Sequence, residues 1–115
     1  MRSMLKAMFC ALLLMVLCVP AFAHPAEKVL LKWEADTETL DVLAAHPVSN
    51  PARHYIVSII VTVNGAKAAE KAYTAQTDPT GTHERFVLSG IKAGAVIEVT
   101  TRCNVSGTLK QTITL

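Results

Sequence analysis

The sequence has few aromatic residues and no run of basic residues, and these shortages exclude several classes of protein. Its 115 residues include one Trp, two Tyr and three Phe, and its Lys and Arg residues are scattered singly. A nucleic-acid-binding surface needs a basic patch, so we expect no nucleic-acid partner. A glycine-rich phosphate loop, a G-x-S-x-G elbow, a zinc-protease helix and a CxxC pair are all missing. The length allows a single domain.

The first 23 residues differ in composition from the rest, and we interpret them as a cleaved export signal. Arg2 and Lys6 form a basic start, residues 7–19 are 13 consecutive apolar residues, and Ala21-Phe22-Ala23 fits a signal-peptidase site. Thirteen apolar residues are too few for a helix to span a bilayer of about 30 Å. We therefore expect cleavage after Ala23, a periplasmic or secreted protein that begins at His24, and no membrane segment after cleavage.

Removal of the signal changes both the net charge and the cysteine count. Two of the eleven basic residues and none of the nine acidic residues lie in the signal, so residues 24–115 are neutral overall. Cys10 and Cys18 leave with the signal, and Cys103 is the one thiol that remains. A single thiol in an exported domain is either a small buried apolar residue, a partner in an intermolecular disulfide or a metal ligand.

Short β-rich segments separated by turn residues fill the chain after the signal, without a long apolar stripe at helical spacing. The strongest segment, 55–63, is followed by the hairpin signal Asn64-Gly65. Repeated short strands separated by turns predict an all-β domain at 24–115. The expected architecture is an immunoglobulin-like β-sandwich of about seven antiparallel strands. The expected strands are 28–35, 40–45, 55–63, 66–75, 84–88, 95–103 and 108–115.

Four histidines and the single thiol are the candidate metal ligands. His46 ends one expected strand and His54 begins the next, so they flank one loop, and Cys103 ends a later strand. Loops from different strands converge at the ends of such sandwiches. Imidazole and thiolate suit a first-row transition metal better than Mg²⁺ or Ca²⁺. We therefore predict a site of His46, His54 and Cys103, with His24 and His83 as further candidates; the alternative is loop histidines on the surface and a core cysteine.

Three motifs resemble the iron-binding domain of the desulfoferrodoxin and neelaredoxin family, the superoxide reductases. They are His46-Pro47, His54-Tyr55-Ile56 and Cys103-Asn104-x-x-Gly107, and the resemblance covers about residues 40–115. It implies an immunoglobulin-like sandwich with a mononuclear, non-haem iron ion (Fe²⁺/Fe³⁺) held by His46, His54 and Cys103. It also implies superoxide or another small anion as substrate, reduction to hydrogen peroxide, and a redox partner protein.

The chain departs from this family at two ligand positions. The family binds iron through four histidines and one cysteine, and its C-N-x-H-G motif has Ser106 in place of the histidine here. A second histidine, which follows Glu-Lys in the family, is Val29 in this sequence. Three ligands still hold a metal with open positions, but the geometry and redox potential then differ from those of the family.

Two further interpretations use the same residues. His46-Pro47, His54-Tyr55-Ile56 and the segment 61–65 also resemble the Z subunit of the bacterial sulfur-oxidation carrier complex, which implies a non-enzymatic binding module without a metal. Alternatively, cleavage before His24 exposes an α-amine beside an imidazole, which favours copper. A second histidine, His46 or His83, would complete that copper site.

Overall fold

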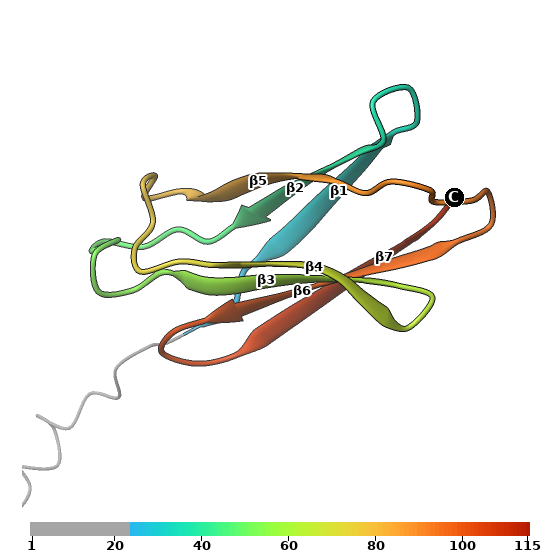
Figure 1. Ribbon diagram of the computed structural model, residues 1–115. Helices are drawn as coiled ribbons and strands as arrows, with labels where there is room; N and C mark the ends of the chain where they lie inside the picture. Colours follow the sequence, from blue (N-terminus) through green and yellow to red (C-terminus); the bar gives the residue numbers. More distant parts are fainter. Residues whose placement is uncertain (1–23) are drawn as a thin grey trace, which may run out of the picture.

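The computed structural model describes residues 24–115, and the predicted export signal lies outside this range. Seven strands form two antiparallel sheets packed face to face, with strand orders β1-β2-β5 and β4-β3-β6-β7 (Figure 1). This architecture confirms the predicted all-β sandwich. Within residues 24–115 no helix is long and apolar enough to cross a membrane. The strands are β1 (Lys28–Glu34), β2 (Thr39–Ala45), β3 (Ile56–Val63), β4 (Ala66–Ala72), β5 (Gly81–Val87), β6 (Val96–Cys103) and β7 (Thr108–Thr114).

Alternation of side chains along the strands places every second residue between the sheets. On β2 the inward side is formed by Leu40, Val42 and Ala44, all fully buried, and on β6 Ile97 and Val99 are buried in the same way. Both inward rows continue toward one end of the sandwich, where the row of β2 reaches His46 and that of β6 reaches Cys103. The same alternation that builds the core therefore directs these two side chains inward.

The start of β5 lies three residues earlier than the sequence predicts. Gly81 pairs with Ala45 of β2, and a Cβ atom at Gly81 would lie 2.1 Å from the carbonyl oxygen of Ala44. Only glycine permits this approach of the two backbones. The sequence predicts only a turn at Gly81. Its contact with Ala44 joins residues far apart in the chain, so no local pattern reveals that Gly81 enters the sheet.

The chain leaves β4 after Ala72, earlier than the predicted end at 75, and crosses to the other sheet. The hydroxyl of Tyr73 donates a hydrogen bond of 2.6 Å to the Glu84 carboxylate on β5. This bond connects the two sheets along one side of the sandwich, and on the opposite side β1 lies against β7. Burial and the Glu84 hydrogen bond raise the pKa of Tyr73, so the phenol stays protonated and donates the bond.

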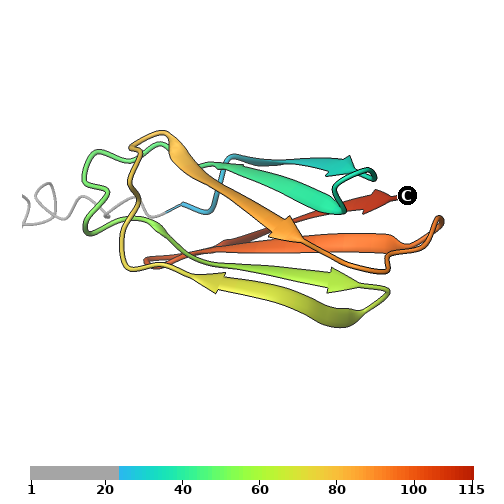
Figure 2. The same ribbon diagram turned by 45° about the horizontal axis from the view of Figure 1, so that its top comes forward.

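Four segments meet at the end of the sandwich opposite the C-terminus. They are the segment before β1, the β2–β3 loop, the β4–β5 connection and the β6–β7 turn, and Figures 1 and 2 show all four at that end. The convergence follows from the two-sheet topology, because antiparallel strands bring alternate connections to the same end. The candidate ligands on these segments are therefore close in space.

Candidate metal centre

Three histidines from two segments form a cluster at this end: His24 precedes β1, and His46 and His54 lie at the two ends of the β2–β3 loop. The rings of His46 and His54 have centroids 4.7 Å apart, and the His24 ring lies 4.8 Å from His46 and 5.0 Å from His54. One ring nitrogen from each histidine lies within 4.8 Å of the others. Metal–nitrogen bonds of about 2.0 Å require ligand nitrogens about 3 to 4 Å apart, so movements of about 1 Å would let the three bind one ion. We call this group the three-histidine cluster.

His24 belongs to the cluster because the residues that follow it are fixed against the fold. Ala26 is buried, and the backbone N–H of Glu27 donates a 2.7 Å hydrogen bond to the carbonyl of Ala45 at the end of β2. Pro25 packs against Gly107 in the β6–β7 turn, where an added Cβ would lie 2.9 Å from the proline ring. The segment that precedes β1 is thus held between β2 and the turn.

His46 is the fully buried member of the cluster. Its Nδ1 lies 2.5 Å from Oε1 of Gln76, and its Nε2 lies 3.1 Å from the backbone carbonyl oxygen of His24. The backbone N–H of His46 donates to the carbonyl of Thr80 at 2.9 Å. Ring and backbone are both held in place, so the imidazole has little freedom to turn away from the cluster.

His54 is positioned by two asparagines that contact its neighbouring backbone. Its own N–H donates to the carbonyl of Asn50 at 2.9 Å, which closes the turn before β3. The Asn104 side chain accepts a hydrogen bond from the Tyr55 N–H and donates one to the Arg53 carbonyl, both at 2.9 Å. Asn104 therefore holds the backbone on each side of His54, and this contact was not foreseen from the sequence.

The electrostatic environment of His54 favours the neutral form, which binds metal. Burial, together with the nearby imidazoles of His46 and His24, lowers the pKa of His54 below its ordinary value. A neutral imidazole has a free lone pair, whereas a protonated one does not bind metal. Among the described residues, Nε2 of His54 is the buried side-chain nitrogen or oxygen that lacks a hydrogen-bond partner. A bound cation would satisfy this atom.

Cys103 and His83 lie outside the three-histidine cluster. Cys103 is 2% exposed, pairs in register with Ile56 of β3, and its sulfur accepts a 3.4 Å hydrogen bond from the Val105 N–H. It thus lies between the sheets at the same end as the cluster without being one of its members. Its position matches the small buried apolar residue that the sequence left open as an alternative.

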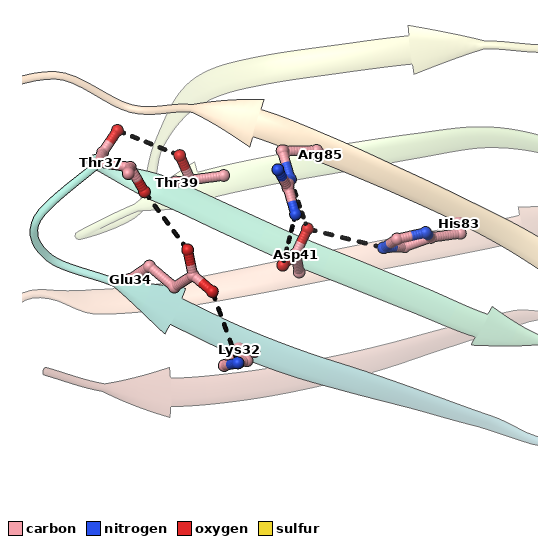
Figure 3. A network of polar contacts seen from close by, with 7 residues as sticks. All are labelled: Lys32, Glu34, Thr37, Thr39, Asp41, His83 and Arg85. Carbon is pink, nitrogen blue, oxygen red and sulfur yellow. Dashed lines mark hydrogen bonds and ion pairs between the residues drawn. The ribbon is translucent and has the colours of Figure 1, made fainter.

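His83 projects from the outer face of the three-stranded sheet. Its Nε2 lies 3.5 Å from the carboxylate of Asp41, which also accepts a 2.9 Å hydrogen bond from Arg85, as Figure 3 shows. The hydrogen bond and charge of Arg85, with a smaller contribution from His83, lower the pKa of Asp41. His83 is therefore part of a surface network of polar and charged groups. Because its side chain is exposed and lies outside the three-histidine cluster, a substitution of His83 is a control for substitutions in the cluster.

Comparison with known proteins adds no relative: the chain matches no protein-family model, no curated protein and no solved structure.

Proposed function

We propose that residues 24–115 form an exported protein that binds one transition-metal ion, copper, through His24, His46 and His54. The observation that carries the proposal is the convergence of three imidazoles, one from the segment before β1 and two from the ends of the β2–β3 loop, around the unsatisfied Nε2 of His54. Three neutral imidazoles form a site typical of zinc and copper. Without an oxygen or sulfur ligand in the cluster, the Irving–Williams order favours Cu²⁺ among divalent ions.

The predicted cleavage after Ala23 adds a fourth nitrogen to this proposal. Cleavage would give His24 a free α-amine, which lies on the same residue as a cluster imidazole. In the described structure the Nδ1 of His24 donates to the carbonyl of Pro25 at 2.9 Å, which leaves its Nε2 free. Chelation by the amine and Nδ1 together would require that the ring give up this hydrogen bond. A chain with one alanine before His24 tests whether the amine contributes.

The test of the proposal is a metal titration of the protein that begins at His24. Calorimetric or competition titrations with Cu²⁺, Zn²⁺ and Fe²⁺ should give one site per chain with copper bound most tightly. The variants His24→Gln and His54→Gln should each weaken copper binding at least about tenfold, because each removes one ligand. His83→Gln, the outer-face control, should bind as the wild type does. Sub-stoichiometric binding, or equal affinity in all variants, would disprove the proposal.

A second candidate function places iron rather than copper in the protein, as the desulfoferrodoxin resemblance implies. One observation favours it: Cys103 lies between the sheets at the same end, with its sulfur hydrogen-bonded to a backbone N–H, and such bonds stabilise thiolates. Anaerobic Fe²⁺ loading followed by oxidation would then give a ferric–thiolate absorption band that Cys103→Ser abolishes. Stopped-flow mixing with superoxide would measure its reduction to hydrogen peroxide.

These measurements also separate the third interpretation, the binding module that resembles a sulfur-carrier subunit. Such a module would be isolated metal-free and would bind neither copper nor iron stoichiometrically. Metal analysis of protein purified from a periplasmic extract therefore distinguishes the three: copper supports the three-histidine site, iron supports the site that includes Cys103, and metal-free protein supports the module.

A further inference from the structure

We infer that Gln76 is a positioning residue of the three-histidine cluster: it holds the proton of His46 on Nδ1 and so leaves Nε2 as the metal-binding nitrogen. The inference deepens the proposed function and rests on it for its effect on metal affinity. The position of the proton on the His46 ring is a property of the metal-free protein and is tested separately.

Gln76 contacts three parts of the chain from the β4–β5 connection, where it is 5% exposed. Its side-chain oxygen lies 2.9 Å from the backbone N–H of Ile56 and 2.5 Å from Nδ1 of His46. Its side-chain nitrogen lies 3.1 Å from the carbonyl oxygens of His46 and Asp78. The end of β2, the start of β3 and the connection itself therefore meet at this one amide.

The orientation of the amide is determined by these backbone partners. The N–H of Ile56 can only donate, so the atom facing it must be the oxygen of Gln76. The two carbonyl oxygens can only accept, so the atom facing them must be the NH₂ group. A flipped amide would place donor against donor and acceptor against acceptor in a buried position, where unsatisfied polar groups are costly.

The fixed oxygen in turn determines the tautomer of His46. Because Oε1 of Gln76 is an acceptor, the Nδ1 atom at 2.5 Å must carry a proton and donate it. In the neutral imidazole the lone pair is then on Nε2, the nitrogen that lies 3.1 Å from the carbonyl oxygen of His24. Two acceptors then face each other there, and a cation that binds Nε2 from beside the pair would offset their repulsion. A metal bound to Nε2 would meet this need.

The same arrangement explains why a glutamine suits this position. Outer partners that accept the second ring N–H of a ligating histidine fix its tautomer and orientation, and their loss typically costs about 10- to 100-fold in metal affinity. Gln76→Glu keeps oxygen acceptors for His46 and Ile56 but loses the NH₂ group. Gln76→Leu loses both functions, and Gln111→Leu, which removes an exposed amide on β7, is the matched control.

The first experiment is long-range ¹H–¹⁵N NMR of the metal-free wild type, at a pH above the ordinary imidazole pKa of about 6.5. We expect a proton on Nδ1 of His46. A His46 ring whose Nδ1 is bare and whose Nε2 carries the proton overturns the inference. This measurement needs no variant, so it decides the question even where Gln76→Leu fails to fold.

The second experiment measures copper affinity in the three variants, with circular dichroism as the folding control. We expect Gln76→Leu to bind copper about 10- to 100-fold more weakly, Gln111→Leu to match the wild type, and Gln76→Glu to bind more tightly than Gln76→Leu. Wild-type affinity in Gln76→Leu, or equal loss in the Glu and Leu variants, overturns the positioning role. Absence of copper binding by the wild type refutes the proposed function instead and leaves the NMR result standing by itself.

Discussion

The Nε2 atom of His46 lies 3.1 Å from the backbone carbonyl oxygen of His24, although 22 positions separate the two residues. At this contact the start of the described chain lies on the end of β2, where the hydrogen bond from the Glu27 N–H to the Ala45 carbonyl holds it. The first residue after the predicted cleavage site is therefore part of the folded structure. The geometry of the candidate site consequently depends on how firmly the segment before β1 is held.

We predict that Gly107→Ala weakens copper binding about tenfold by displacing the segment that bears His24. The added methyl group would lie 2.9 Å from the Pro25 ring, and Gly107 also has a positive φ of 92°. Gly65→Ala is the matched control, because its φ is 84° but nothing lies within 4 Å of the added atom. Both substitutions should lower stability by about 1 kcal/mol.

Isothermal titration with copper distinguishes the two glycine variants. A weaker affinity in Gly107→Ala alone shows that the Pro25 contact positions His24. Equal affinities in both variants would mean that the segment before β1 adjusts without moving the ligand.

The metal-free protein should lose stability as the pH falls below about 6.5, the ordinary imidazole pKa. Because the pKa of His54 is lowered in the folded state, the unfolded chain takes up its proton first. Stability therefore rises with pH through this window and is unaffected by His54 above it. Urea unfolding at several pH values across this window gives the free energy of unfolding as a function of pH. This free energy should change less steeply with pH in His54→Gln than in the wild type. The same pH dependence in both proteins would contradict the assigned cause.

Asn104→Ala should weaken both the fold and the metal site. The substitution removes the hydrogen bonds to Tyr55 and Arg53 on either side of His54. We expect a loss of about 1 to 2 kcal/mol in the free energy of unfolding, since each such bond contributes about 1 kcal/mol. Copper affinity should fall as well, because the His54 backbone is released. Stability is measured by urea unfolding and affinity by titration; Asn50, which keeps its bond to His54, makes complete loss of binding unexpected.

Cys103 should react slowly with a thiol reagent in the native protein and rapidly in urea, because its side chain is buried. Copper bound at the three-histidine cluster should leave this rate almost unchanged. Strong protection by iron, together with a ferric–thiolate band, would instead support the site that includes Cys103. The rate is followed by the absorbance of the leaving group that the thiol reagent releases.

The strand pattern gave most of the fold, and the exceptions have local causes. Alternating apolar residues and the Asn64-Gly65 turn predicted about seven strands, and residues 24–115 form seven. The early start of β5 depends on the contact of Gly81 with the Ala44 carbonyl, which links residues far apart in the sequence. A sequence pattern describes neighbours along the chain and cannot display such a contact.

The candidate site was predictable in part. His46 and His54 were expected together because they flank one loop, and the structure brings them together. Gln76 was missed because a single polar residue in a connecting segment has no local signature. Its role appears only through partners 20 and 30 positions away.

The sequence by itself determined the all-β class, the strand order along the chain and the supply of imidazoles near strand ends, because these follow from side-chain type and local spacing. The tertiary structure alone decided which candidate ligands meet. It placed His24 beside His46 and His54, directed His83 to the outer face, and left Cys103 between the sheets outside the cluster. The physical reason is that membership of a site depends on which face of a strand a residue occupies and which segments pack together at one end.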